Sequence, residues 1–467
     1  MKDDSSGRFP AALLVATMAW IAPCPAAEPQ RHSVIVSVDG LGADVLRKGH
    51  PCNAALREIR RLADGGVYSA RVRGIFPTIT VPSHATIVTG RAPASHGVVD
   101  NGAPGKPYGW YMDRSDIRGD TLWDAARKAG ISVAIVTWPL TYGAHVDQLI
   151  PENLSSESNV AELIRQGSTP GLFESLREAT GSVALLPFSA RESGTPLDAM
   201  TSRFADEVVR RYRPGLLLVH FLDFDHRQHY AGPGSPEACD ALARIDSHVG
   251  SLVAAYRKAG IVENTTFFIL SDHGFLPVRR EVNVAAILAG AGWSDASAGG
   301  RAPHDAFDIR LAGGSVVFYP KFPDSKPLAA PFAARLRASI ASRYSGIARW
   351  IGPEKLQAFG ASPQAAFALC AVPGNSFAYD PAKKDALAIA TPSVKGSHGY
   401  CPDEKSMDAV FIANGALVGR RGRIPELGIA DIGPTIADLI GVSLQGASGL
   451  SRAALVRGAA PRRKPSP

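Results

Sequence analysis

The stretch Ser33-Val34-Ile35-Val36-Ser37-Val38-Asp39-Gly40 places an apolar run, rich in β-branched residues, directly before a carboxylate. A continuous run of this kind, without polar alternation, is typical of a parallel strand that is buried on both faces. Ligands collect beyond the carboxyl ends of such strands. The stretch therefore predicts a parallel sheet and marks Asp39 as a candidate site residue.

Helical patterns and apolar runs alternate along the rest of the chain. A helical pattern at 53–64 stops at Gly65-Gly66, and a final strand at 409–413 and a helix at 432–440 close the series. Between them, helices are expected at 121–128, 201–212 and 236–258, each followed by a strand, at 131–137, 216–222 and 265–270. This alternation predicts an α/β fold with a mostly parallel central sheet and helices on both faces.

The pattern weakens between residues 278 and 391, where Gly, Ala and Pro become frequent and the expected elements become short. We expect an inserted small subdomain there. The catalytic core would then consist of residues 28–277 and 392–450, followed by a basic, disordered tail at 451–467. Five of the cations behind the net charge of +7 lie in that tail, so the body is nearly neutral and specific nucleic acid binding is not indicated.

The N-terminus has the pattern of a secretory signal. Lys2 and Arg8 precede an apolar run at 11–22, and small residues follow it. We expect a signal peptide at 1–27 and a periplasmic or secreted protein. No later run is long enough for a membrane span.

Four cysteines follow the expected signal: Cys52, Cys239, Cys370 and Cys401. An even number in an exported protein permits two disulfides, with three possible pairings. We favour Cys370 with Cys401, because both lie in one C-terminal stretch.

A candidate nucleophile lies in Phe76-Pro77-Thr78-Ile79-Thr80-Val81-Pro82-Ser83-His84. Pro82 fits the first turn of a helix, which would place Thr80 at a helix N-terminus, where an alkoxide and a phosphate are favoured. Thr78 is an equal candidate on this evidence, and Thr80 could instead cap the helix. His84 and His96 are expected to bond to backbone.

Further candidates are ligands for metal ions. Asp225 and His229 are spaced i, i+4, which suits one metal or a surface ion pair, and Asp223 and His226 are rivals nearby. Other candidates are Asp272 and His273, which follow the strand at 265–270, and His398, which lies between glycines. With Asp39 and Thr80, this set of three carboxylates, three imidazoles and one hydroxyl suits two divalent cations.

The motifs VSVDGLGADVL, FPTITVPSHATIVTGRAPASHGVVDN, DFDHRQHYAGP, ILSDHGF and KGSHGY occur in this order. Their order and spacing resemble the nucleotide pyrophosphatase/phosphodiesterase branch of the alkaline phosphatase superfamily. The resemblance implies an alkaline phosphatase-like fold, a small-molecule phosphate ester substrate and two Zn²⁺ ions. It implies that Thr80 is the nucleophile and that Asn101 donates to a phosphoryl oxygen. It also implies the ligand sets: Thr80, Asp39, Asp272 and His273 for one zinc, and Asp225, His229 and His398 for the other.

Two positions depart from the nucleotide-hydrolysing pattern. Val81 and His220 stand where an aromatic residue would be expected to stack on a base. Other residues could form a different apolar wall or pack in the core: Trp138, Tyr142, Phe221 and Tyr230.

We therefore expect a phosphodiesterase rather than a phosphomonoesterase or phosphonate hydrolase. A monoester would need extra cations near the site, and the candidates are Arg91, Lys106, Arg114 and Arg118. The alternative from another class is a non-catalytic exported binding protein.

Overall fold

A computed structural model describes residues 1, 30–103, 109–292, 307–321, 325–389 and 392–458. The expected signal peptide, Lys106 and much of the expected tail lie outside these residues. No helix within the described ranges is long and apolar enough to cross a membrane.

Strand β1 (His32–Val38) lies at the centre of the main sheet, between β5 (Leu216–Phe221) and β6 (Thr265–Leu270), and it is parallel to both. Strands β3 (Val133–Val136) and β4 (Gln148–Ile150) extend the sheet beyond β5, also in parallel. Beyond β6, strand β16 (Ala409–Gly415) runs antiparallel to both β6 and β2 (Val67–Arg73). Two short strands complete this sheet: β17 (Gly422–Arg423) and β18 (Leu427–Gly428).

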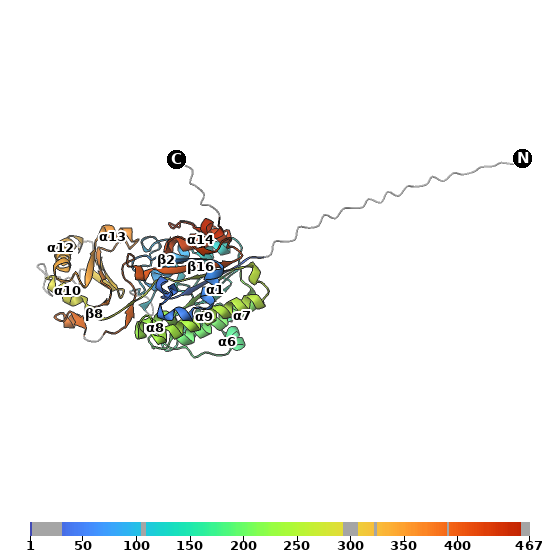
Figure 1. Ribbon diagram of the computed structural model, residues 1–467, viewed down its shortest axis with the longest axis horizontal. Helices are drawn as coiled ribbons and strands as arrows, with labels where there is room; N and C mark the ends of the chain where they lie inside the picture. Colours follow the sequence, from blue (N-terminus) through green and yellow to red (C-terminus); the bar gives the residue numbers. More distant parts are fainter. Residues whose placement is uncertain (2–29, 104–108, 293–306, 322–324, 390–391, 459–467) are drawn as a thin grey trace. The chain divides into compact units, whose positions relative to one another are not determined.

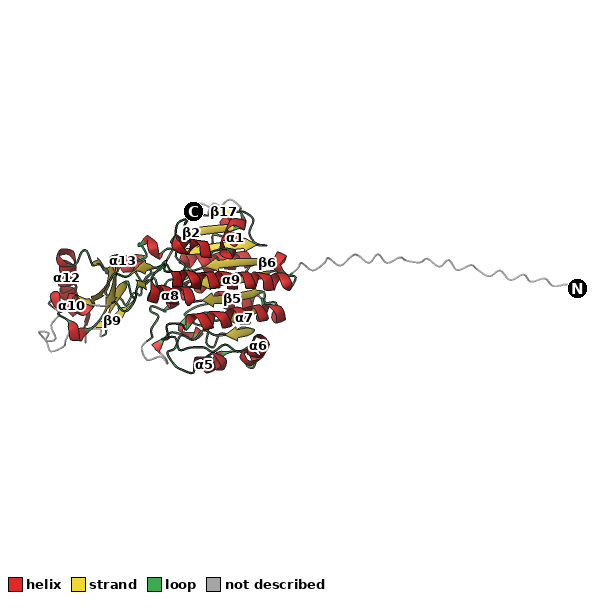
Figure 2. Ribbon diagram, turned by 60° about the horizontal axis from the view of Figure 1, so that its bottom comes forward, coloured by secondary structure: helices red, strands yellow, loops and turns green. Residues whose placement is uncertain are grey.

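Helices cover both faces of the sheet, and the side chains of β1 show this directly. Val34, Val36 and Val38 contribute to one apolar core, whereas Ile35 contributes to the other. The first core includes residues of α1 (Glu58–Gly65), α6 (Leu172–Thr180), α7 (Gly194–Tyr212) and α9 (Pro236–Lys258), and Figure 2 shows α7 and α9 across the strands. The second includes residues of α2 (Thr80–Thr89), α4 (Leu122–Lys128) and α14 (Ile432–Ile440). These two layers confirm the predicted fold class.

Residues between 280 and 389 form separate sheets, and most of a third apolar core comes from them, with Tyr400 and Met407 added from the following segment. One sheet is antiparallel and contains β9 (Phe307–Leu311), β10 (Ser315–Pro320), β11 (Ala348–Ile351) and β12 (Phe367–Ala371). A second contains β8 (Arg280–Asn283), β13 (Asn375–Ala378) and β14 (Ala388–Ile389). The α-helices among the described residues here are α10 (Val284–Gly290), α12 (Ser325–Arg343) and α13 (Pro353–Ala358), labelled in Figure 1. The boundaries at 278 and 391 stay a prediction, because residues 31–467 form one compact unit.

The helix expected at 53–64 begins later than predicted. A 3₁₀ turn occupies Pro51–Ala55, and α1 starts at Glu58. The carboxylate of Asp246 explains this start, because it accepts the backbone N–H groups of Arg57, Glu58 and Ile59, each at 2.9 Å. A partner this remote in sequence is invisible to a local pattern.

The four cysteines form two disulfides, Cys52–Cys239 and Cys370–Cys401. The favoured pairing is confirmed. The first disulfide joins segments 187 residues apart and ties the 3₁₀ turn at Pro51–Ala55 to α9.

Candidate active site

Three neighbouring strands bring the three candidate aspartates together. In the register of the sheet, Val38 of β1 pairs with Phe221 of β5, and Ser37 pairs with Leu270 of β6. The three strands therefore end at the same level. Asp39 follows β1, Asp272 follows β6 after one residue, and Asp225 lies in α8 (Asp223–Ala231) directly after β5. Parallel pairing alone accounts for this convergence.

Histidines complete the cluster from other segments. The Nε2 atom of His273 lies 3.5 Å from Asp39 Oδ1 and 3.1 Å from Asp272 Oδ2. Nε2 of His229 lies 3.5 Å from one oxygen of Asp225, and Nε2 of His398 lies 3.6 Å from the other. The structure thus brings all six predicted aspartate and histidine ligands into one cluster.

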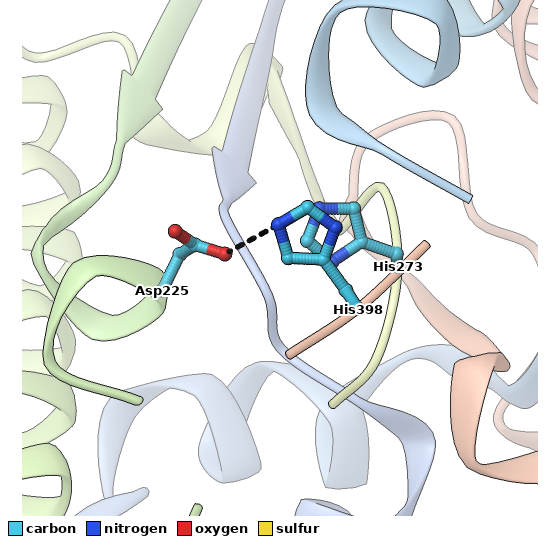
Figure 3. A group of neighbouring side chains, drawn as sticks. All are labelled: Asp225, His273 and His398. Atoms are coloured by element: carbon cyan, nitrogen blue, oxygen red, sulfur yellow. Dashed lines mark ion pairs between the residues drawn. The ribbon is translucent and has the colours of Figure 1, made fainter. Parts of the chain in front are cut away.

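Two groups of three residues in this cluster could each hold a metal ion. One contains Asp39, Asp272 and His273, and the other contains Asp225, His273 and His398, with ligand atoms within 4.8 Å of one another in each. Figure 3 shows the second group, in which the rings of His273 and His398 stack with their centroids 3.9 Å apart. His273 lies between the two groups, and His229 lies beside the second. The division into two ligand sets implied by the resemblance stays a prediction.

The carboxylate oxygens that lack hydrogen-bond partners indicate whether a metal ion fits this cluster. Oδ1 of Asp39, Oδ1 of Asp225 and Oδ2 of Asp272 are buried and have no hydrogen-bond partner among the described residues. Buried charges of this kind need a cation. Without one, burial and the charge of Asp39 raise the pKa of Asp272 to about 7, and burial with Asp39 and Asp272 raises the pKa of Asp225 well above its usual range. The carboxylates fit a divalent metal.

The histidines fit a metal as well. The Nδ1 atoms of His229, His273 and His398 each lie against a backbone carbonyl oxygen, at 3.0, 3.3 and 3.3 Å. Donation from Nδ1 leaves the lone pair on Nε2, which faces the carboxylates, and this is how metal-binding histidines are usually oriented. Burial lowers the pKa of His229 to about 4, and burial and the neighbouring His273 lower the pKa of His398 well below its usual value. Neutral imidazoles are the form that binds metals.

Thr80 faces this cluster from the first turn of α2. Its hydroxyl lies 3.4 Å from Nε2 of His273 and does not cap the helix, because the N-cap is Ile79, without a side-chain hydrogen bond. The rival Thr78 donates its hydroxyl to the carbonyl oxygen of Tyr400 at 2.8 Å. The capping alternative is therefore wrong, and of these two threonines Thr80 is the one whose hydroxyl contacts the cluster.

Asn101 and Thr80 both line a cavity that adjoins the cluster. The Oδ1 atom of Asn101 accepts the backbone N–H of Val81 at 2.8 Å. That bond assigns Nδ2 as the free end of the carboxamide, so Asn101 has two N–H groups left to donate. The geometry suits a group that binds a phosphoryl oxygen.

The neighbouring polar residues have structural partners. Asp223 forms ion pairs with Arg227 and Arg244, at 3.2 and 2.8 Å, and is not a ligand candidate. His84 bonds to the carbonyl oxygen of Thr80 and to the hydroxyl of Ser37. His96 accepts the backbone N–H of Val98, as expected, and also bonds to the hydroxyl of Thr86.

A cavity of about 160 Å³ opens beside Thr80 and Asn101. Asp39, Asp225, His229 and His398 of the cluster also line it. Apart from these and His226, the remainder of its wall is apolar or aromatic: Trp110, Leu154, Phe188, Leu222, Tyr230 and Val394. Of the four aromatic residues considered from sequence, only Tyr230 lines this cavity. Trp110 and Phe188 come from connecting segments without a periodic pattern, so no local sequence signal marks them as lining residues.

Two sets of residues considered from the sequence do not line this cavity. Val81 and His220 are both 1% exposed and do not line it, so they form no wall of a substrate slot. The described cations considered for a monoester, Arg91, Arg114 and Arg118, do not line it either. Arg91 donates to the carbonyl oxygen of Gln445, and Arg114 pairs with Asp124. Among the described residues, the lining contains no Lys or Arg.

Comparison with known proteins identifies related sequences. The sequence model of the type I phosphodiesterase / nucleotide pyrophosphatase family matches residues 33–400. Human ectonucleotide pyrophosphatase/phosphodiesterase family member 1 is 27% identical over 263 residues, which cover 54% of this chain and 24% of the human protein. An uncharacterized pyrophosphatase/phosphodiesterase of Schizosaccharomyces pombe is 25% identical over 407 residues, 83% of this chain and 72% of that protein. Venom phosphodiesterase 2 of Crotalus adamanteus is 25% identical over 259 residues, 54% of this chain and 28% of the venom protein. The chain thus spans about a quarter of the human and venom relatives.

Proposed function

The chain belongs to the type I phosphodiesterase / nucleotide pyrophosphatase family, and on that premise we propose that it hydrolyses phosphodiesters with Thr80 as nucleophile and two zinc ions as cofactors. The observation that carries this proposal is the cluster of unpartnered carboxylate oxygens and imidazole Nε2 atoms beside the hydroxyl of Thr80, which lies 3.4 Å from Nε2 of His273. The proposed ligands are those implied by the sequence: Asp39, Thr80, Asp272 and His273 for one ion, and Asp225, His229 and His398 for the other.

The residues of the chain divide the chemistry among them. Thr80 supplies the oxygen that bonds to phosphorus as the alcohol leaves, and water then hydrolyses the phospho-threonine. Asn101 donates N–H groups to a phosphoryl oxygen, and the N-terminus of α2 favours the negative charge there. Two bound divalent cations would lower the pKa of the attacking hydroxyl groups and stabilise charge on the leaving oxygen.

The cavity favours a diester with an apolar alcohol. A monoester carries a second phosphoryl charge, and no Lys or Arg among the described lining residues would neutralise it. Trp110, Phe188 and Tyr230 offer aromatic surface to a small apolar group, whereas the two positions expected to stack on a base are buried. A phosphomonoesterase or phosphonate hydrolase is the second candidate, and a non-catalytic binding protein is the third.

We also propose that the protein is exported, as its N-terminal sequence predicts. The disulfides Cys52–Cys239 and Cys370–Cys401 support this, because structural disulfides are typical of oxidising compartments. A further part of the proposal is that residues 278–391 are a subdomain inserted into the catalytic core, which their separate sheets and core support.

Four chromogenic substrates test the proposed activity: bis-p-nitrophenyl phosphate, p-nitrophenyl phosphate, a phosphonate monoester and p-nitrophenyl thymidine monophosphate. We expect the first to be hydrolysed fastest, EDTA to abolish turnover and Zn²⁺ to restore it. Faster turnover of p-nitrophenyl phosphate would favour the monoesterase. Bound zinc without turnover of any of the four would favour the binding protein.

A further inference from the structure

His220 connects two buried carboxylates behind the candidate metal centre. Its Nδ1 atom lies 2.6 Å from Oε1 of Glu152, and its Nε2 atom lies 3.3 Å from Oδ2 of Asp39. His220 is 1% exposed, Asp39 4% and Glu152 5%, so water does not compete for these contacts. The proposed chemistry uses neither His220 nor Glu152.

The surroundings of His220 fix its ring in place. His220 lies on β5 directly opposite Ser37 of β1, and its ring meets the ring of His84 edge-on, with centroids 4.5 Å apart. The ring of Trp138 packs on the same His84 at 5.1 Å. A ring held in this way can direct its nitrogen atoms only at Glu152 and Asp39.

The two oxygens of Asp39 are consequently not equivalent. Oδ2 lies 3.3 Å from Nε2 of His220, an ion-pair contact outside hydrogen-bond geometry, whereas Oδ1 has no hydrogen-bond partner among the described residues and lies 3.5 Å from Nε2 of His273. Oδ1 is therefore the oxygen that faces the first group of candidate ligands. Glu152 is buried beside the second ring nitrogen, Nδ1, and can fix the orientation of the ring, much as carboxylates orient histidines near metals.

We propose that Glu152 and His220 are positioning residues that hold Asp39 by Oδ2 and present Oδ1 alone to a metal ion. The proposal rests on the proposed metal centre. It differs from a packing role for His220, because loss of a packing residue would weaken the binding of both metal ions or of neither. Loss of a positioning residue would weaken the binding of the one ion that Asp39 binds.

Zinc titration of the EDTA-treated protein, in competition with a chromogenic chelator, tests this proposal. The double variant H220F/E152Q keeps an aromatic ring at position 220 and leaves no unpaired glutamate. We expect one of two zinc equivalents to bind about 10- to 100-fold more weakly in this variant, the range for lost partners of metal ligands, and the other to change less than about threefold. E152Q alone should weaken the same equivalent to a smaller extent.

The matched control is H96F, which makes the same change at a buried histidine that bonds to Thr86 and Val98. It should leave both zinc affinities unchanged. Unchanged affinities in folded H220F/E152Q, or equal weakening of both equivalents, would overturn the positioning role. A wild-type protein that binds no zinc would instead overturn the metal centre itself, so the two failures are distinguishable.

Discussion

The substitution Asp272→Asn tests how much the buried charge of Asp272 destabilises the metal-free protein, and how much the same charge contributes to zinc binding. Oδ1 of Asp272 accepts the backbone N–H groups of Gly40 and His273, at 3.1 and 3.0 Å, and a carboxamide oxygen can keep both bonds. Oδ2 has no hydrogen-bond partner and lies 3.1 Å from Nε2 of His273. One amide N–H group at that position could donate to the ring nitrogen, so the substitution removes the charge and gives one of the two new N–H groups an acceptor.

The expected gain in stability follows from the pKa of Asp272. Burial and the charge of Asp39 raise that pKa to about 7, whereas an unfolded Asp titrates near ~3.9. A carboxyl group with a raised pKa makes the metal-free folded protein progressively less stable as the pH rises from the unfolded to the folded value. Roughly three pKa units correspond to about 4 kcal/mol, of which about a third has developed at pH 5. D272N should therefore be more stable than wild type in EDTA, by about 4 kcal/mol at pH 8 and 1–2 kcal/mol at pH 5.

Guanidinium unfolding at both pH values, with EDTA or with Zn²⁺, measures this difference. Zinc at 100 times its dissociation constant adds about 2.7 kcal/mol per site to the wild type, and the variant should lose most of this at one site. The stability advantage of D272N over wild type should therefore be smaller in Zn²⁺ than in EDTA.

The matched control is Asp206→Asn on α7. Burial raises the pKa of Asp206 to about 6, and one of its oxygens is unpartnered. This variant should gain stability equally in EDTA and zinc. A D272N protein that is less stable than wild type in EDTA at pH 8 would refute the reasoning.

Three further outcomes are expected. Thr80→Ala should lower kcat at least ~10³-fold, whereas Thr78→Val, which removes only the bond to Tyr400, should cost about 1 kcal/mol of stability and keep kcat within tenfold; equal losses of kcat would contradict the choice of Thr80. Trp110→Ala should raise KM for bis-p-nitrophenyl phosphate about tenfold with kcat nearly unchanged, and a lower kcat with unchanged KM would show that Trp110 is not a binding wall. Burial and Arg118 lower the pKa of His96 to about 3, so wild-type stability is lost as pH falls from ~6.5 toward that value. His96→Gln should flatten this loss in unfolding at pH 4 and 7, and an unchanged slope would speak against a buried neutral ring.

The sheet was predictable where its strands are continuous apolar runs. Strands β1, β5 and β6 match the predicted runs closely, and their shared register explains why the aspartates that follow them meet. Strand β2 was not predicted, and β16 was, but not its antiparallel direction. Direction depends on the path of the chain between strands, which apolar runs do not encode.

His220 shows why the face of a buried strand is hard to predict. Every residue of β5 is buried, so no alternation of polar and apolar residues reveals which side chains face the site. The sequence interpretation took His220 for a replaced wall residue, whereas the fold turns it toward Asp39 and Glu152. The cavity lining at Trp110, Phe188 and Val394 escaped prediction for a different reason, because these residues lie outside regular helices and strands.

The charges of the two ligand groups suggest how one site can both hold metals and bind an anion. Two dications carry four positive charges and the three aspartates carry three negative charges, which leaves one positive charge for the substrate. The group with Asp39 and Asp272 has two carboxylates and would be neutral with its ion, whereas the group with Asp225 has one and would stay positive. Asp225, His229 and His398 all line the cavity, whereas of the other group Asp39 and Thr80 line it and Asp272 and His273 do not. The residual charge therefore lies on the group that contributes all of its proposed ligands to the cavity wall, which favours an anionic substrate there.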